Sequence, residues 1–454
     1  MKIVIVGAGE VGFHIANRLA LENKNVVVID KNPDALRRVA DNIDVQVIQG
    51  SGSNPSILEE AGIREANIML AVTNQDETNL VACVVTDIIS PSTKKIARIR
   101  NADFDKYHDT LRYNPPHIDT VINPEIEVVK TIDRLMTVPG AVEVGEFANG
   151  LVKVVGINLE ENSRLRGLRL LDLPSVIQKS RPLIAAIVRD DQLIIPRGDD
   201  VLLHKDLIYF TCEVDKLTET LSVFDKIAHP VKRVLIIGGG RIAIRLASLL
   251  EKKSIYTKII EKDQKRCAEL AKRLDKTIVL HGDGSDHQLL MEENVSDADF
   301  VVSLTNDEET NILTSLLVQR MGAKKTITKI SKFSYMPLMS ALGMHMVVNP
   351  RLSAINSILQ YVRKGKVLSA MSIKGEQGEV IEAVALATSQ IVGKPLKNVP
   401  FPKGALIVGI IRGDKVTIPS GESIINPDDR IIIFSTRQAI PKIEKFLTVK
   451  LEFF

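Results

Sequence analysis

MKIVIVGAGEVG, residues 1–12, is a short apolar strand that runs into a Gly-x-Gly-x-x-Gly turn. Residues 231–243 repeat this pattern as VKRVLIIGGGRIA, with alanine in the third glycine position. A second apolar strand follows each turn and ends on an acid, Asp30 in the first copy and Glu261 in the second, 231 residues apart. Because each turn keeps its strand, helix and acid in register, the sequence predicts a dinucleotide-type site in each half of the chain.

The residue types of the turn suit a phosphate group. The first glycine allows a sharp turn, the second lets a phosphate approach the backbone, and the third lets the next helix pack against the strand. The N–H groups and dipole at the start of that helix attract an anion. The acid that ends the second strand can bind an adenosine ribose, which favours NAD or another adenine nucleotide over NADP. The pyrophosphate is expected over Gly9, Glu10 and Val11, and over Gly240, Arg241 and Ile242. The alternative is a nucleotide fold that keeps its turn without a ligand.

Composition narrows the class of protein. The chain has 454 residues, of which 45% are hydrophobic, and this length suits two to four domains with real cores. The net charge is +3 with acids and bases interspersed, so no nucleic-acid partner is expected. Three widely spaced cysteines fit a reducing compartment. The chain begins in a strand and has no apolar run of about 18 residues, so we expect a cytosolic protein without a signal peptide.

Apolar strands and helical stretches alternate in each large repeat, which predicts an α/β fold with a Rossmann-like parallel sheet covered on both faces. The expected strands of the first repeat are Lys2–Val6, Asn25–Asp30, Val45–Ile48, Ile68–Val72 and Lys95–Arg100. Those of the second are Arg233–Ile237, Thr257–Glu261, Thr277–Leu280, Phe300–Leu304 and Thr326–Ile330. Each repeat closes with an Asn-Pro turn and an amphipathic helix, at about Glu125–Met136 and Leu352–Val362.

A short β-rich segment with Pro and Gly turns follows each of these helices, and it also repeats. Residues 198–210 are echoed by residues 421–434. The chain is therefore predicted to be a large unit and a small unit, twice. The predicted nucleotide-binding domains are 1–123 and 231–348, the crossover helices with their linkers are 124–140 and 349–366, and the small domains are 141–227 and 367–453.

Polar runs follow the fourth strand of each large repeat, TNQDETN at 73–79 and TNDEETN at 305–311. They lie at the carboxyl ends of strands, where open α/β sheets bind ligands, so Thr73 and Asn74 are candidate ligand contacts. Asn74 with Glu77, and the equivalent pair in the second copy, are also expected to form a capping box for the next helix.

Arg98 lies on the fifth expected strand, and Lys329 is its counterpart in the second copy. A cation at this edge can pair with a phosphate or a carboxylate. The alternative is a solvated basic stripe, because Arg98 and Arg100 share a strand face. We prefer the ligand interpretation for Arg98.

These motifs, in this order, resemble the domains that regulate the conductance of potassium, known as RCK or KTN domains, with an N-terminal and a C-terminal part. The tandem duplication is similar to the peripheral subunit of Trk potassium-uptake systems. The resemblance implies nucleotide contacts by Gly7, Ala8, Gly9, Glu10, Val11, Asp30, Thr73, Asn74 and Arg98, beside the third glycine, Gly12, and by Gly238, Gly239, Gly240, Arg241, Ile242 and Glu261. Ser51 stands where many members carry an aspartate, as Asp283 does in the second copy, which implies that the two sites differ.

The resemblance also implies a function. It is that of a nucleotide-sensing gate, peripheral to the cytoplasmic face of the cell membrane, which controls a membrane-embedded potassium-translocating subunit of the TrkH or TrkG type. The implied cofactors are NAD or NADH, with ATP and ADP as further candidates, and the implied assembly is a ring, expected as a homotetramer. No catalytic residue and no bound metal are expected.

The rival hypothesis is an NAD-dependent oxidoreductase, because the same glycine turn serves hydride transfer. A dehydrogenase needs a substrate domain with a general acid or base beside the nicotinamide. Each predicted nucleotide unit is followed by a segment of fewer than 90 residues, too short for the usual substrate domain. The eight histidines are scattered, and no His/Asp pair recurs between the repeats. The regulatory hypothesis is therefore preferred to an enzyme.

Overall fold

The computed structural model describes the whole chain except residues 178–181, 227–229, 363–366, 375–376 and 448–454. It contains two compact units. The first consists of residues 1–127 and 350–362, and the second of residues 128–349 and 363–454. The predicted domain boundaries at 227, 366 and 453 lie outside the described residues, and the other boundaries stay predictions. None of the described helices has both the length and the apolar composition needed to cross a membrane.

The first unit is built on a six-stranded parallel sheet with the order β3-β2-β1-β4-β5-β6. Its strands are β1 (Lys2–Val6), β2 (Asn25–Asp30), β3 (Gln46–Gln49), β4 (Ile68–Ala71), β5 (Lys94–Arg98) and β6 (Thr120–Ile122). The winding reverses between β1 and β4, and in sheets of this doubly wound order ligands bind at the carboxyl ends of the strands beside that reversal. The predicted Rossmann-like sheet is thus confirmed.

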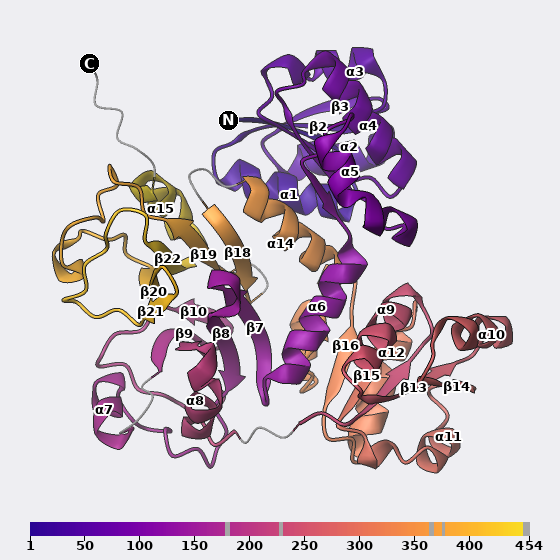
Figure 1. Ribbon diagram of the computed structural model, residues 1–454, viewed down its shortest axis with the longest axis vertical. Coiled ribbons are helices and arrows are strands. Elements are labelled where there is room, and N and C mark those ends of the chain that lie inside the picture. The colour runs from indigo at the N-terminus through magenta and orange to yellow at the C-terminus, as the bar shows by residue number, and fades with distance from the viewer. Residues whose placement is uncertain (178–181, 227–229, 363–366, 375–376, 448–454) are drawn as a thin grey trace. The chain divides into compact units, whose positions relative to one another are not determined.

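Helices connect these strands, and one helix comes from far along the chain. The helices of the first unit are α1 (Glu10–Leu21), α2 (Pro33–Asn42), α3 (Pro55–Glu60), α4 (Asp76–Ile89), α5 (His108–Tyr113) and α14 (Pro350–Val362). In α14 one apolar face, which includes Ala354, Ile355, Ile358 and Leu359, is buried. This helix packs on α1 (Figure 1). The first nucleotide-type domain is therefore covered by a segment that follows the second one in sequence.

The second unit contains the other parallel sheet, with the matching order β14-β13-β12-β15-β16-β17. Its strands are β12 (Arg233–Ile237), β13 (Tyr256–Glu261), β14 (Ile278–His281), β15 (Phe300–Ser303), β16 (Thr326–Lys329) and β17 (Val347–Val348). Its helices are α9 (Arg241–Lys252), α10 (Gln264–Arg273), α11 (His287–Glu292), α12 (Glu308–Arg320) and α13 (Met336–Ala341). The sequence analysis missed the short sixth strand of both sheets, β6 and β17, because two or three residues leave no periodicity to read.

Two five-stranded antiparallel sheets of equal connectivity complete the second unit. The first has the order β10-β9-β11-β8-β7, from β7 (Ala141–Phe147), β8 (Val152–Asn158), β9 (Leu183–Arg189), β10 (Gln192–Ile194) and β11 (Leu207–Glu213). The second has the order β18-β19-β22-β20-β21, from β18 (Val367–Ile373), β19 (Gly378–Val384), β20 (Ala405–Arg412), β21 (Lys415–Thr417) and β22 (Arg430–Thr436). Their short helices are α7 (Leu173–Val176), α8 (Leu217–Val223) and α15 (Ile440–Leu447).

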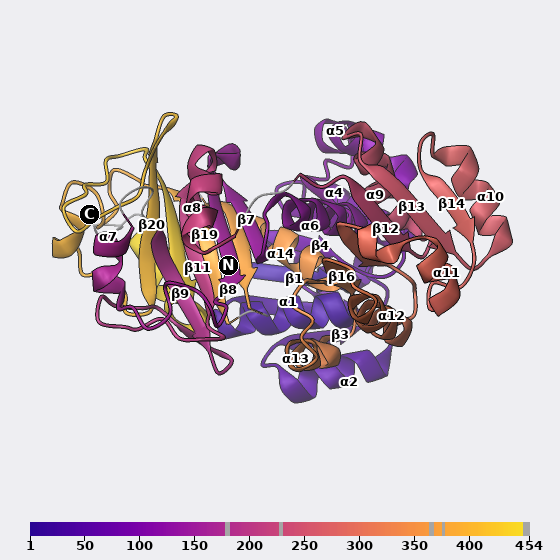
Figure 2. The ribbon, with the colours of Figure 1, turned by 90° about the horizontal axis from the view of Figure 1, so that it is seen from below.

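The two small sheets pack face to face, as Figure 2 shows. Tyr209 of β11 and Phe434 of β22 meet in this interface, with ring centroids 5.7 Å apart. The neighbours Ile208 and Phe210 point to the opposite face of β11 and join a different core. Both faces of β11 are thus buried, which explains why its sequence is apolar almost throughout rather than alternating.

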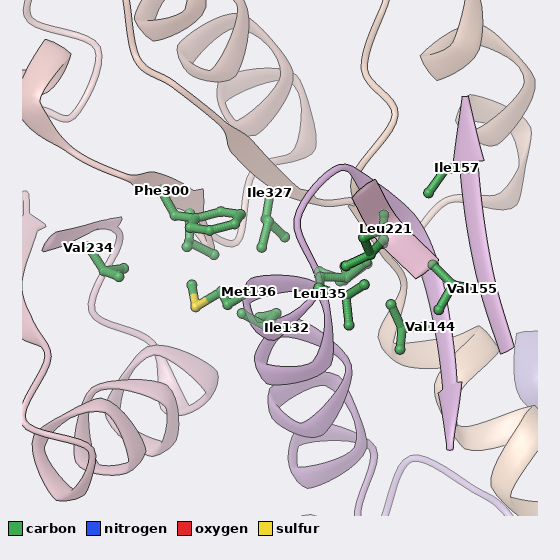
Figure 3. Close-up of a cluster of buried hydrophobic side chains, with 14 of the residues drawn as sticks. Ile132, Leu135, Met136, Val144, Val155, Ile157, Leu221, Val234, Phe300 and Ile327 are labelled. Atoms are coloured by element: carbon green, nitrogen blue, oxygen red, sulfur yellow. The ribbon is translucent and has the colours of Figure 1, made fainter. Parts of the chain in front are cut away.

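Helix α6 (Pro124–Thr137) joins the cores of the second unit. Figure 3 shows Ile132 and Met136 of α6 on the side of Val234 and Phe300, which belong to the parallel sheet. The same hydrophobic cluster continues to Val144 and the other apolar residues of the first small sheet. This continuous core fixes the first small domain against the second nucleotide-type domain.

Candidate functional site

The first glycine turn follows β1, and two of its positions have steric constraints that only glycine satisfies. Gly7 has φ +114°, and a Cβ there would lie 3.0 Å from the backbone nitrogen of Thr73 at the end of β4. A Cβ on Gly12 would lie 1.8 Å from the carbonyl oxygen of Gly7. The first and third glycines are therefore needed for the turn itself and for the contact between α1 and the strand.

Gly9 differs from its two neighbours in the motif because nothing crowds it. It has φ −65° and ψ −175°, which any residue can adopt, and no atom lies within 4 Å of the position of a Cβ. It is also the N-cap of α1 and, as a glycine, has no side chain that could cap the first N–H groups of the helix. Open space beside unsatisfied N–H groups at a helix start is the setting in which proteins bind phosphate.

The acid at the end of β2 holds this turn. The Asp30 carboxylate accepts hydrogen bonds from the N–H of Ala8 at 2.6 Å and from the N–H of Asn32 at 2.9 Å. In the second copy Glu261 accepts from the N–H of Gly239 at 2.6 Å and from that of Asp263 at 2.8 Å. Each carboxylate oxygen has a further lone pair, so these bonds leave room for a ribose hydroxyl. The structure places both acids against their glycine turns, and the ribose contact stays a prediction.

Thr73 lies beside the turn and is hydrogen-bonded to Asn79, a residue to which the sequence analysis assigned no role. Asn79 is fully buried; its Oδ1 accepts from the N–H of Thr73 at 2.9 Å and from its hydroxyl at 2.7 Å, and its Nδ2 donates to the carbonyl oxygen of Arg98 at 2.8 Å. Asn311 does the same for Thr305 and Lys329. The asparagine that closes each polar run thus joins the carboxyl ends of two neighbouring strands. Its recurrence in both copies, six residues after the threonine, was the available signal.

The predicted capping boxes are wrong. Helix α4 begins at Asp76, its N-cap is Gln75, and no side chain caps it. Asn74 lies outside the helix and is exposed, and its carbonyl oxygen accepts a hydrogen bond from Arg100. In the second copy the N-cap is Asp307, whose carboxylate accepts from the N–H of Thr310. The reason is a turn formed by the threonine before each helix: the hydroxyls of Thr73 and Thr305 accept hydrogen bonds from the N–H groups two residues later in the chain. Each helix therefore begins one residue later than predicted.

Arg98 ends β5 at the same edge as Thr73, and one of its Nη atoms donates to the Thr73 carbonyl oxygen at 3.3 Å. Its Nε is buried, and no described residue accepts a hydrogen bond from it. Burial, followed by the like charge of Arg100, lowers the pKa of Arg98 to about 10. A partly buried cation with a spare donor would be stabilised by an anionic ligand. Arg100 lies beyond the end of β5 and is close enough to Arg98 to repel it, and the ligand contact of Arg98 stays a prediction.

The second turn has the same backbone conformation as the first, but different side chains contact it. Gly240 matches Gly9, with φ −67° and ψ −178° and only a backbone oxygen 4.0 Å from a Cβ position. Gly239, however, has Leu270 close to its Cβ position, and the Arg266 guanidinium donates to its carbonyl oxygen at 2.9 Å. Arg241 and Ile242 start α9 as Glu10 and Val11 start α1.

A charged pair is a further difference between the copies. Asp283, the counterpart of Ser51, pairs with Lys262 at 2.9 Å. Hydrogen bonds from Ser285 and the pairing with Lys262 lower the pKa of Asp283 to about 2. In the first copy the Ser51 hydroxyl is hydrogen-bonded to that of Ser53 at 2.8 Å. The two glycine turns therefore share one backbone geometry and differ in the charges around it.

The described residues include no group of three or more His, Cys, Asp or Glu side chains arranged to hold a metal ion. A hollow of about 540 Å³ lies among Lys232, Tyr256, Lys258 and their neighbours, but at the amino ends of β12 and β13. It is therefore separate from the nucleotide edge.

Family models match most of the chain. The model of the TrkA-N domain matches residues 3–124 and 234–350, and the model of the TrkA-C domain matches residues 154–225 and 380–448. The chain belongs to the TrkA family. The predicted resemblance to RCK domains in tandem is thus confirmed, and the two glycine turns lie one in each TrkA-N domain.

Curated relatives match this chain over nearly its whole length. The Trk system potassium uptake protein TrkA homolog 1 of Methanosarcina mazei is 38% identical over 98% of this chain and 100% of its own. The Trk system potassium uptake protein TrkA of Azorhizobium caulinodans is 36% identical over 100% of both chains. That of Haemophilus influenzae is 35% identical over 98% of both.

Solved structures share the fold at low identity. The GsuK channel bound to NAD matches with a TM-score of 0.60 and 17% identity, over 98% of this chain and 78% of that chain. The RCK domain of GsuK also gives 0.60, over 98% and 94%. These matches confirm the predicted pairing of a Rossmann-like domain with a small β-rich domain.

Proposed function

We propose that this chain is the nucleotide-sensing regulatory subunit of a potassium-uptake system. The observation that carries the proposal is the pair of open cradles at Gly9 and Gly240, each at a helix start and each backed by an acid at the end of the next strand. NAD or NADH is the first candidate ligand, and ATP and ADP are the others. The potassium-translocating partner is inferred from the names of the full-length relatives.

The site residues proposed to contact the nucleotide are those that surround the cradles. Gly9, Glu10 and Val11 supply N–H groups to the diphosphate, Asp30 binds the ribose, and Arg98 pairs with a phosphate. Gly240, Arg241, Ile242 and Glu261 take the same roles in the second copy. Thr73 and Asn74 line the switch point next to Gly7. Gly7, Ala8 and Gly12, like Gly238 and Gly239, shape the turns.

Nucleotide binding would act on the partner as a coupling free energy between two sites. A nucleotide that binds one arrangement of the assembly about 100-fold more tightly than another shifts the equilibrium by about 2.7 kcal/mol. Helices α6 and α14 are the proposed movable parts, because each joins a large domain to a small one. The proposed setting is a ring of these chains, a homotetramer, at the cytoplasmic face of the membrane beneath a subunit of the TrkH or TrkG type.

A regulatory role is proposed in preference to an oxidoreductase. The charged groups at the carboxyl edge of the first sheet include Asp30, Arg98 and the Glu10–Arg38 pair, 2.6 Å apart. Asp76 also lies there, and its carboxylate accepts from the N–H of Arg100 at 3.0 Å. These groups are suited to binding a nucleotide rather than to exchanging a proton with a substrate. Oxidation of NADH in the presence of hydroxy acids or amino acids would support the rival.

Single-channel recording tests the proposal. The chain is reconstituted with a Trk-type membrane subunit in a bilayer, and NAD, NADH, ADP and ATP are added in turn. At least one nucleotide should change the open probability several-fold. The Gly9→Asp/Gly240→Asp chain should remove this response, and Arg64→Met, at the amino end of β4 and away from both turns, should keep it. An open probability that is equal for the four nucleotides and without them would refute the proposal.

A further inference from the structure

An arginine from the second half of the chain lies at the start of α1. Helix α14 packs on α1 and carries Arg351 at its second residue. An Nη atom of Arg351 lies 3.7 Å from Oε2 of Glu10, which is the first residue of α1 and directly follows the open Gly9. That separation is within ion-pair range but longer than a hydrogen bond. The contact is therefore loose.

Glu10 already has a closer cation. Its Oε1 lies 2.6 Å from the guanidinium of Arg38, which also lies over the ring of Phe13 at 4.3 Å. Burial alone would raise the pKa of Glu10, but the hydrogen bond and charge of Arg38 outweigh it, and Arg351 and His14 lower the pKa further. Glu10 is thus ionised and paired without Arg351. Arg351 brings an additional positive charge to the phosphate end of the first site.

Arg98, another cation of this edge, is close enough to Arg351 and to Arg100 for these charges to repel it. Arg98 also has a buried Nε with no acceptor among the described residues. Two guanidinium groups from different parts of the chain that repel each other across a helix start are both stabilised by an anion. The non-bridging oxygens of a diphosphate have the charge and the geometry for this.

We infer that Arg351 is a phosphate-binding residue of the first nucleotide site, supplied by the second half of the chain. Its guanidinium, which lies beside Glu10, binds the diphosphate of a bound nucleotide. The inference rests on the proposed function and adds a residue that the glycine motif does not contain. The second copy is not expected to do the same, because the residue after its corresponding Asn-Pro turn is Glu125, and Arg241 replaces Glu10.

Arg351 lies directly after the second nucleotide-binding domain in the chain, so its contact at the first site bears on the second. β17 (Val347–Val348) is the edge strand of the second parallel sheet, and only Asn349 and Pro350 separate it from Arg351. A nucleotide in the first site would therefore hold the segment that leaves the second nucleotide-binding domain. This gives the two sites a covalent route for coupling.

The test uses the full chain with Gly240→Asp, so that the second site is blocked. Calorimetry measures the affinity for NADH of this parent, of Arg351→Met, which keeps the stem and removes the charge, and of Arg351→Lys, which restores it. Arg351→Met should weaken NADH binding about tenfold or more, as expected for a lost charge-assisted hydrogen bond, and Arg351→Lys should recover most of it. Arg64→Met is the matched control, because Arg64 pairs with Glu59 before the start of β4. It should bind as the parent does.

Two results would overturn the inference. One is an affinity for NADH that Arg351→Met leaves unchanged. The other is an equal loss in Arg351→Met and Arg351→Lys, which would indicate a structural role for the guanidinium. A parent that binds no NADH, ATP or ADP at all would instead contradict the proposed function at the first site.

Discussion

At the scale of single residues, the two turns obey the same rule with different side chains. Gly12 cannot carry a Cβ because the carbonyl oxygen of Gly7 occupies its place. Ala243 carries one in the second copy and is fully buried. The backbone adjusts, since Gly238 has φ +95° where Gly7 has φ +114°. The third position of the motif therefore requires a residue small enough for the space beside the turn. Glycine satisfies this requirement in the first copy and alanine in the second.

Gly12→Ala should destabilise the first unit by about 1–3 kcal/mol, the range for overpacking, because the blocking atom belongs to the backbone. Ala243→Gly is the matched change and should cost less, about 1–2 kcal/mol, because it adds backbone freedom within α9 and removes a buried methyl group. Urea denaturation of both variants measures the difference. If Gly12→Ala cost no more than Ala243→Gly, the steric account of the first turn would be wrong.

Asn79→Ala should lower the free energy of unfolding by about 2–4 kcal/mol. It leaves the Thr73 N–H and hydroxyl and the Arg98 carbonyl oxygen without their partner in a buried place. Asn79→Asp keeps the acceptor but loses the Nδ2 donor, so a further loss should appear above the pKa of the new carboxyl group. Denaturation at pH 5 and pH 8 checks both. Exposed Asn74→Ala is the control and should change stability by less than about 0.5 kcal/mol.

At the scale of elements, apolar periodicity predicted most strands to within one residue at either end. β1, β2 and β12 have the predicted bounds, and β5 ends two residues earlier than predicted. Both crossover helices were also predicted, as α6 and α14. The helix start after β4 was misjudged because Asn74 and Glu77 have the spacing of a capping box, while the competing bonds of Thr73 depend on tertiary contacts.

Packing partners could not be predicted from the sequence. α14 and α6 are both amphipathic, and neither pattern tells which copy of the duplicated domain receives the helix. Only the structure places α14 on α1 and so brings Arg351 to Glu10. The spare donor of Arg98 is likewise a result of burial, since the sequence left a solvated stripe open as an alternative.

The interface of the two small sheets contains a buried acid that makes stability depend on pH. Glu143 accepts a hydrogen bond from the Tyr209 hydroxyl at 2.8 Å and faces the N–H of Lys374 at 3.5 Å. Burial raises the pKa of Glu143, and these bonds and the charge of Lys374 only partly offset it. Lys374 itself pairs with Asp191 at 3.2 Å.

The folded state therefore binds a proton at Glu143 more tightly than the unfolded chain does. Its contribution to stability is largest at low pH and is lost as the pH rises through the raised pKa, by about 1.4 kcal/mol for each unit of the rise. Glu143→Gln keeps the acceptor for Tyr209 and should be more stable than the wild type at pH 8, with little difference at pH 4. Thermal unfolding at both values measures this. A variant less stable than the wild type at pH 8 would show that the carboxylate is favourable there.

At the scale of the whole molecule, duplication has produced two sites with one architecture and unequal surroundings. Glu10 and Arg38 flank the first cradle, while Arg266 and the Lys262–Asp283 pair flank the second. We therefore expect the chain to bind two nucleotides with different affinities. Helix α6, from the first half of the sequence, packs in the core of the second unit, and helix α14, from the second half, packs on α1 of the first unit. These helices could transmit a change at one site to the other.

Calorimetric titration of the full chain with NADH and ATP tests the central claim most directly. The account predicts two nucleotide sites per chain. One should be lost in Gly9→Asp and the other in Gly240→Asp. An aspartate at either N-cap should leave the helix stable while competing with a phosphate for its N–H groups. A wild-type chain that releases no heat with NADH, ATP, NAD or ADP, or aspartate variants that bind as tightly as the wild type, would contradict the account.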